Sequence, residues 1–260
     1  MNSPKAYLAG PVVFVLGLLA LIAAWLAMEP AALRRAFDQG GYSPFELATI
    51  PFYAAIVPLV WWKCPFSGSR VRRALLCLAV SCVAFMAVVK ELDWHLWAMH
   101  NLFPDVVGAD GSVRGLVKPN GEALTGTPFK MRFLTNAGAP FGAKALALAY
   151  FSLFFGVFGV TLAYFAKDLA AGFFKKVPPA WTMCCFGAAG VMVQLCDRMP
   201  AWIRHMRGLP KPKGDEIDAI SSLFTALEEG GEMLIAVFAI LAIIQAHALY
   251  GKKRGAGDCA

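Results

Sequence analysis

The chain has 260 residues, of which 58% are hydrophobic and only 16% are charged, and its mean hydropathy is +0.59. This composition excludes an ordinary soluble domain and indicates a membrane protein. The net charge is +7. Because the basic residues gather in a few loops, we attribute this charge to membrane topology and expect no nucleic-acid partner.

Six stretches are apolar for long enough to cross a hydrocarbon core of about 30 Å. They cover residues 7–28, 45–62, 74–89, 145–166, 180–196 and 233–250. The last stretch is the end of a longer apolar helix that begins near Ile217. The sequence predicts one all-α membrane domain over residues 1–260, with about six transmembrane helices; five or seven are the alternatives.

Basic residues are concentrated in three connections that a six-helix topology places on one side. They are Lys63, Arg70, Arg72 and Arg73 after the second helix, Lys167, Lys175 and Lys176 after the fourth, and Lys252, Lys253 and Arg254 in the tail. Lys and Arg in short loops are retained on the cytoplasmic side. We therefore expect a bacterial inner (cytoplasmic) membrane protein with both termini in the cytoplasm.

The second helix begins with a polar motif. Ser43 suits the N-cap, Pro44 the first helical position and Glu46 the third position of a capping box. This pattern explains Glu46 by a structural role. Glu46 is also a candidate for substrate binding if other polar groups lie beside it.

The third helix ends in acidic and imidazole groups. Glu91 and His95 are four residues apart, so they share one face if the helix continues past Val89. Such a pair can ligate a metal or share a proton, although a hydrogen-bonded pair at a helix end is more common. His100 and Asn101 follow at the start of the next loop.

The only long polar insertion covers residues 101–144, between the third and fourth helices. Turn signals such as Asp110-Gly111 typically flank short strands, so we expect a small outer cap with one or two β-hairpins. Lys130 and Arg132 alternate with apolar residues, which places both on one face of a strand. There they bind an anionic headgroup or the carboxylates below, or they contact solvent.

The sixth helix carries three glutamates. Glu228 and Glu232 share a face, and Glu229 is close to both. Carboxylates at membrane depth are unfavourable unless they are paired, hydrated or bound to a metal. Lys90 and Arg198 would pair with them in a structural network. A divalent metal is the functional alternative, because carboxylates and imidazoles together suit zinc, manganese or iron.

Four short motifs resemble a group of uncharacterised bacterial multi-pass membrane proteins. They are Ser43-Pro-Phe-Glu46-Leu-Ala-Thr49, Lys90-Glu91-Leu-Asp93-Trp94-His95, Met99-His100-Asn101 and Leu227-Glu228-Glu229-Gly-Gly-Glu232-Met233. The group shows an early D-G-x-x-E-x-x-T helix start, a central E-E-x-S-W-G-Q stretch followed by L-H-N, and a late E-E-x-x-E helix.

This resemblance implies a multi-pass fold and a shared set of residues, without a function. It carries over to Glu46, Glu91, Trp94, His100, Asn101, Glu228, Glu229 and Glu232. The chain departs from the group at Leu92-Asp93 and at His95, where the group has another acid and a glycine. The resemblance therefore does not support His95 as a ligand.

Three classes of function fit these residues. The first is a membrane-embedded hydrolase or transferase acting on a lipid or polyprenyl-linked substrate. Its acid/base groups would be Glu91, His100, Glu228, Glu229 and Glu232. Its substrate-binding residues would be Glu46, Asn101, Lys130, Arg132 and Arg198. Its divalent-metal ligands would be Glu91, His95, His100 and Glu232. The second is a non-catalytic membrane scaffold, and the third is a proton- or ion-coupled transporter. We favour the enzyme; the sequence assigns no oligomeric state.

Overall fold

Long helices account for most of the chain in the computed structural model, which describes residues 5–37, 43–66, 68–208 and 219–255. They are α1 (Ala9–Ala27), α2 (Pro30–Phe37), α3 (Pro44–Lys63), α4 (Arg70–Glu91), α5 (Trp94–Leu102), α6 (Met131–Leu134), α7 (Phe141–Phe151), α8 (Val157–Phe174), α9 (Pro178–Met206) and α10 (Ala219–Gly255). The turn η1 (Ala6–Leu8) precedes α1, and a π-helical turn, η2 (Ser152–Gly156), joins α7 to α8.

Six of these helices, two of them composite, are long and apolar enough to cross a membrane, as the sequence predicts. Their spans are Ala6–Ala27, Pro44–Lys63, Arg70–Glu91, Phe141–Phe174, Pro178–Met206 and Ser221–Tyr250. The architecture is that of a multi-pass membrane protein. The expected start of the last helix near Ile217 lies outside the described residues.

The third and fifth helices are longer than the predicted apolar stretches. The third span begins at Arg70 and reaches Glu91, beyond the predicted 74–89. The fifth continues through Asp197 and Arg198 to Met206, because both side chains are exposed and leave the backbone hydrogen bonding of the helix intact. Asp197 and Arg198 therefore lie inside a helix and do not mark its end.

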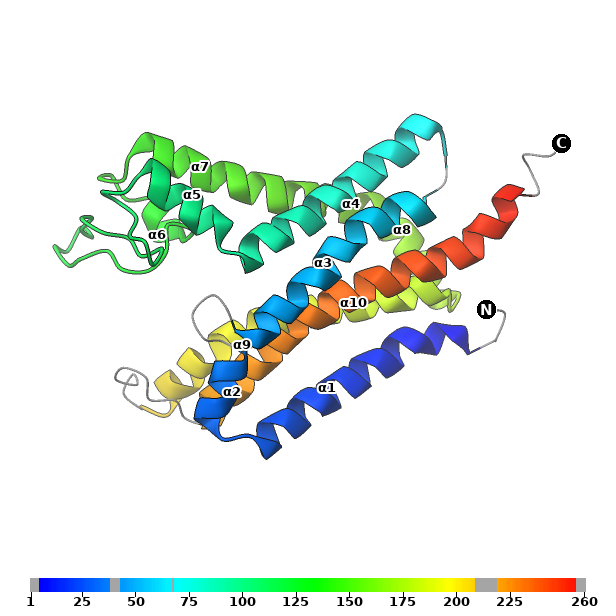
Figure 1. Cartoon of the computed structure of the whole chain (residues 1–260), viewed down its shortest axis with the longest axis horizontal. Coiled ribbons are helices and arrows are strands. Elements are labelled where there is room, and N and C mark those ends of the chain that lie inside the picture. The colour runs from blue at the N-terminus through cyan, green and yellow to red at the C-terminus, as the bar shows by residue number, and fades with distance from the viewer. Residues whose placement is uncertain (1–4, 38–42, 67, 209–218, 256–260) are drawn as a thin grey trace.

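Helix α10 is the centre of the bundle, where it packs against α1, α2, α3 and α9 (Figure 1). Glycines allow the closest approaches. A Cβ atom on Gly230 would overlap the side chain of Leu21 in α1, and one on Gly231 would lie 2.6 Å from Val193 in α9. Small residues at such crossings bring helix backbones together in membranes.

The cap consists of α5, α6, the beginning of α7 and the loop between α5 and α6, and it has its own apolar core. Met99, Val107 and Phe133 are completely buried there. The cap lies at one end of the molecule, which we call the cap end, opposite the end where α1 begins and α10 finishes (Figure 1). We call the latter the terminal end.

The predicted β-hairpins of the cap are not confirmed. The described residues form no strand, only isolated antiparallel bridges between Val107 and Val113 and between Val117 and Ala123. The two bridges are ten residues apart in the chain, and each closes one tight turn. The chain then turns again before a second bridge can form, so no ladder develops.

Lys130 and Arg132 are also placed differently from the prediction. Lys130 is the N-cap of α6, and Arg132 lies inside this short helix. Both side chains are exposed. The alternation of basic and apolar residues therefore forms one helical turn that buries Phe133, and the two basic groups do not share a strand face.

The cap helices stay apart from the central bundle. Helix α5 packs on α4 and α7, and α6 packs on α7. Among the described elements, none of α5, α6 and α7 packs against α1, α2, α3, α9 or α10. Figure 1 shows the result as two arms that diverge toward the cap end, with α4 and α5 in one arm and α3 and α10 in the other.

Candidate functional site

Helix α4 ends where the two arms diverge. After Glu91 the backbone leaves the helix at Leu92, and Asp93 has a left-handed conformation with φ of +50°. Aspartate tolerates this region better than most residues. Helix α5 then starts at Trp94, so Glu91 and His95 belong to different helices. The prediction that they share one helical face is therefore wrong.

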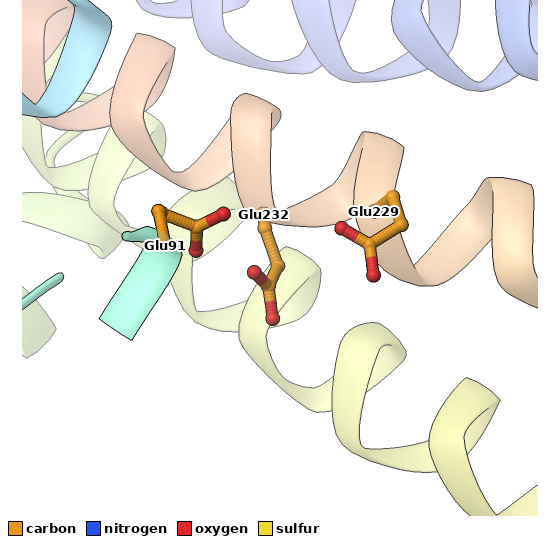
Figure 2. A group of neighbouring side chains, drawn as sticks. All are labelled: Glu91, Glu229 and Glu232. Carbon is orange, nitrogen blue, oxygen red and sulfur yellow. The ribbon is translucent and has the colours of Figure 1, made fainter. Parts of the chain in front are cut away.

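Three glutamates meet beside this break. Glu91 comes from α4, and Glu229 and Glu232 come from successive turns of α10. One carboxylate oxygen from each lies within 4.8 Å of the others, and Figure 2 shows the three side chains along one side of α10. Glu91 is only 8% exposed. We call these residues, together with Lys90, the acid cluster.

Lys90 connects two members of the acid cluster. Its Nζ atom lies 3.2 Å from Glu91 Oε1 and forms a second ion pair with Glu232 Oε2. Within the described part of the chain, Glu229 takes part in no hydrogen bond or ion pair. One ammonium group thus accompanies three carboxyl groups, so the cluster can accept further positive charge as protons or as a cation.

Tyr53 links the acid cluster to α3. Its hydroxyl donates a hydrogen bond of 3.0 Å to the backbone carbonyl of Glu232. Tyr53 is nine residues after Pro44 and ten before Lys63, so it lies about halfway along α3, roughly 15 Å from either end. The Glu232 backbone is therefore level with the middle of α3, whereas Glu91 is the last residue of the span Arg70–Glu91.

A second polar group extends from the acid cluster toward the cap. Burial raises the pKa of Asp93, while His95 and Lys90 oppose this change. Burial lowers the pKa of His95, and the Val89 carbonyl and Asp93 oppose the decrease. The His95 ring stacks on Tyr150 with 5.0 Å between ring centres. His95 thus belongs to an aromatic contact beside the cluster and not to the carboxylate group itself.

His100 and Asn101 are used inside the cap. His100 Nδ1 lies 2.8 Å from the carbonyl oxygen of Val107, which fixes one side of the imidazole to the cap loop. Asn101 is exposed and donates a hydrogen bond of 2.8 Å to the Trp97 carbonyl. Neither residue is among the described groups that converge on the acid cluster.

The capping box around Glu46 is confirmed. Glu46 Oε2 accepts a 2.8 Å hydrogen bond from the backbone of Ser43, and Ser43 Oγ accepts one of 3.1 Å from the backbone of Glu46. Glu46 also lies close enough to Glu229 for electrostatic repulsion between them. This carboxylate therefore has a structural role at the edge of the cluster.

The remaining candidates do not converge on the same point. Glu228 lies near enough to Cys196 of α9 to interact with it electrostatically, whereas Glu229 and Glu232 lie beside Glu91. Arg198 is exposed on α9, and no ion pair joins it to the glutamates in the described ranges. Of the two neutralising residues that the sequence suggests, the structure places Lys90 in the cluster.

The donor set bears on the kind of metal that the cluster can hold. Three carboxylates without imidazole or thiolate are hard oxygen ligands, which suit Ca²⁺, Mg²⁺ or Mn²⁺ better than zinc. A separation of up to 4.8 Å matches opposite ligands of Ca²⁺, at about 2.3–2.6 Å from the metal. Any such ion would compete with Lys90 for Glu91 and Glu232.

Sequence reasoning did not identify the two tyrosines. Tyr53 and Tyr150 each adjoin a phenylalanine in an apolar stretch, where they are indistinguishable from lipid-facing or core residues. Tyr150 lies near enough to Lys90 and Glu91 to interact with them electrostatically. The one available signal was a polar hydroxyl inside each span, since buried tyrosine hydroxyls usually have a hydrogen-bond partner.

Comparisons with protein-family models, curated proteins and solved structures find no match for this chain.

Proposed function

We propose that this protein is a membrane-embedded enzyme, a hydrolase or transferase, that uses the acid cluster for acid/base chemistry on a lipid or polyprenyl-linked substrate. The observation that carries this proposal is the excess of carboxylates over ammonium groups at membrane depth, with Glu229 left without an ion-pair partner in the described chain. An unneutralised carboxylate in such a place is unfavourable for folding and is typically kept for function.

The interrupted backbone beside the cluster supports the proposal. Helix α4 ends at Glu91 and α5 starts at Trp94, at a level set by Tyr53 near the middle of α3. Non-helical backbone at membrane depth is tolerated where it is buried in protein or lines a cavity. A structural scaffold would need neither this interruption nor the third carboxylate.

The residues suggest distinct roles. Glu229 is the general base, which takes a proton from an attacking water or substrate hydroxyl. The Lys90 ammonium stabilises negative charge that develops on the substrate. Glu91 and Glu232 hold Lys90 through their ion pairs, and the Tyr53 hydrogen bond fixes this part of α10. A metal-dependent reaction is the alternative form of the same proposal.

The cap faces the outside of the cell in this proposal, and the terminal end faces the cytoplasm. The basic residues of the loop after α3 and of the loop after α8 lie at the terminal end, which agrees with their retention on the cytoplasmic side of a bacterial inner membrane. Lys63 and Lys176 there lie over the rings of Trp62 and Tyr7, as expected of a membrane interface.

The experiment is a product search in lipid nanodiscs. Purified protein is incubated with bacterial polar lipids and a polyprenyl phosphate-linked probe, and products are identified by mass spectrometry. We expect a product with the parent protein and with Glu122→Gln, whose carboxylate lies in the exposed cap, and none with Glu229→Gln or Lys90→Met. Equal product from all four proteins would exclude the acid cluster as the catalytic site.

Elemental analysis of the same samples separates the two forms of the mechanism. A bound divalent metal that is lost on Glu91→Gln and Glu232→Gln supports metal-assisted chemistry. Product formation that survives chelation, in protein without stoichiometric metal, supports acid/base chemistry by Glu229 alone.

A proton- or ion-coupled carrier is the second candidate. The observation in its favour is the depth of the cluster, since carriers bind their ions near the membrane midplane beside interrupted helices. Reconstituted vesicles with an internal pH dye test it. Flux that depends on a pH gradient and disappears in Glu232→Gln, without any lipid product, would replace the enzyme by a carrier.

A further inference from the structure

A pocket opens on the membrane-facing surface between α4 and the composite helix α7–η2–α8. Its volume is about 550 Å³, within the roughly 300–1,000 Å³ of typical ligand pockets. Ala79 lines it from α4, and Ala149, Ser152, Gly156 and Val160 line it from the composite helix. The pocket therefore lies within two spans and away from the acid cluster's own side chains.

The local sequence explains the hollow. The π-helical turn η2 inserts one wide turn at Ser152–Gly156, and such turns often mark functional sites. Most of the lining side chains are small or β-branched, Leu153 being the largest, and a Cβ atom on Gly156 would meet no atom within 4 Å. Thr161, at the far end, donates its hydroxyl to the Val157 carbonyl at 2.7 Å, so it offers little to a polar ligand.

The surroundings identify the chemistry of the occupant. Exposed surface of membrane spans contacts hydrocarbon, so an apolar hollow there is filled by a hydrocarbon chain and not by a polar solute. Along the composite helix, Ala149 and Thr161 are twelve residues apart, which is about 18 Å. This length is close to one leaflet of a hydrocarbon core about 30 Å thick.

One end of the pocket, at Ala149, adjoins a residue that lies near the acid cluster. Tyr150 follows Ala149, stacks on His95 and lies near Lys90 and Glu91. A chain in the pocket would thus have its polar head beside one ammonium group and an excess of carboxylates. Lys90 complements a phosphate, and Glu229 complements an ammonium group, which together match a zwitterionic headgroup.

We propose that the pocket holds one acyl chain of an aminophospholipid such as phosphatidylethanolamine, whose headgroup lies at the acid cluster. This inference rests on the proposed function and names the substrate class of the same site. The chain anchors the lipid in the groove between α4 and the composite helix, and the charges of the cluster select the head.

Photolabelling tests the proposal. Protein in nanodiscs is irradiated with phosphatidylethanolamine that carries a diazirine in one acyl chain, and labelled peptides are mapped. We expect labels at 149–161 and near Ala79. Gly156→Leu should reduce this labelling about tenfold or more, because displacing two methylene groups already has an effect of this size. Gly159→Leu is the matched control, since Gly159 also faces open space but does not line the pocket.

The contrary outcomes are distinct. Equal labelling of Gly156→Leu and the parent protein, or equal labelling by phosphatidylglycerol with the same chains, would overturn the inference. Cross-linked dimers through Ser152→Cys would assign the pocket to a second copy of the chain. Glu229→Gln separates this inference from the proposed function: it should lose the product and the preference for phosphatidylethanolamine over phosphatidylglycerol, but keep a chain label from both lipids. If the parent protein is labelled in the pocket but forms no product, the lipid pocket is supported and the proposed enzyme is excluded. If the parent protein forms product but is not labelled in the pocket, the enzyme is supported and the lipid pocket is excluded.

Discussion

Lysine–glutamate pairs occur in two regions of this protein, under opposite conditions. In the cap, Lys118 Nζ lies 2.8 Å from Glu122 Oε2, with side chains 33% and 64% exposed. In the acid cluster, the Lys90 side chain is itself 48% exposed, but its partners Glu91 and Glu232 are only 4% and 13% exposed. The cap pair is matched one to one, whereas the cluster contains more acid than base.

The difference shows that a contact distance alone does not determine how much an ion pair contributes to stability. A solvent-exposed pair contributes about 0–1 kcal/mol, because water and salt screen it. A buried pair contributes little to net stability when it is intact, yet it becomes strongly unfavourable when one partner is removed. The cap pair is therefore dispensable, while Lys90 is required for the carboxylates around it.

Removal of Lys90 should have the largest effect. Lys90→Met leaves Glu91 and Glu232 without their ammonium partner, and breaking a fully buried pair costs about 3–5 kcal/mol. Because Lys90 is itself 48% exposed, we expect the free energy of unfolding, measured by denaturant titration in mixed micelles, to fall by about 3 kcal/mol, the lower end of this range. The double variant Lys90→Met/Glu232→Gln should recover part of the loss. A double variant as unstable as the sum of its single substitutions would contradict the coupling.

Overpacking the helix that carries the cluster should have an intermediate effect. Gly230→Ala forces a methyl group against buried Leu21, and such overpacking costs about 1–3 kcal/mol. Leu21→Ala in the same chain should relieve part of the cost. In the cap, Gly121 has open space but a φ of +82°, so Gly121→Ala should cost about 1–2 kcal/mol through backbone strain with no rescue by Leu21→Ala.

Periodicity and charge predicted the spans and the glutamates, because long apolar runs and carboxylates in them are visible residue by residue. They did not predict the break at Leu92–Asp93. Its left-handed Asp93 joins α4 to α5, and no glycine marks this position in the sequence. The same break puts Glu91 and His95 in different helices, so their predicted pairing failed. Lys90, one of the two neutralising residues that the sequence suggests, lies at the centre of the acid cluster.

The cap shows the opposite limit of prediction from sequence. Turn signals at Asp110-Gly111 located its reversals, and Gly111 has the expected positive φ of +70°. The strands between them were inferred from the turn signals, and turns that follow so closely leave no room for a ladder. In short polar segments, the positions of turns can therefore be predicted from sequence, but the conformation of the residues between the turns cannot.

A smaller effect is expected at His95, between the two regions. Burial lowers its pKa, so the unfolded imidazole binds a proton below pH of about 6.5 while the folded one does so only at lower pH. Acidification through this window should destabilise the fold, and His95 adds no pH dependence above it. Asp93→Asn removes a charge that raises this pKa, so it should lower the pKa further, as histidine-labelled NMR can measure; an increase would contradict the placement.

The smallest effect is expected at the cap pair. Lys118→Met should change the free energy of unfolding by less than about 1 kcal/mol, and raising the salt concentration should remove most of this change, because exposed charges are screened over about 10 Å or less. The loss caused by Lys90→Met should persist at the same salt concentration, since few ions reach the buried carboxylates. The salt dependence of the two losses thus compares the burial of the two ion pairs, whatever the size of each loss at low salt. If both losses vanished together in salt, Lys90 would be a solvated surface charge, and the case for a desolvated acid cluster would fail with it.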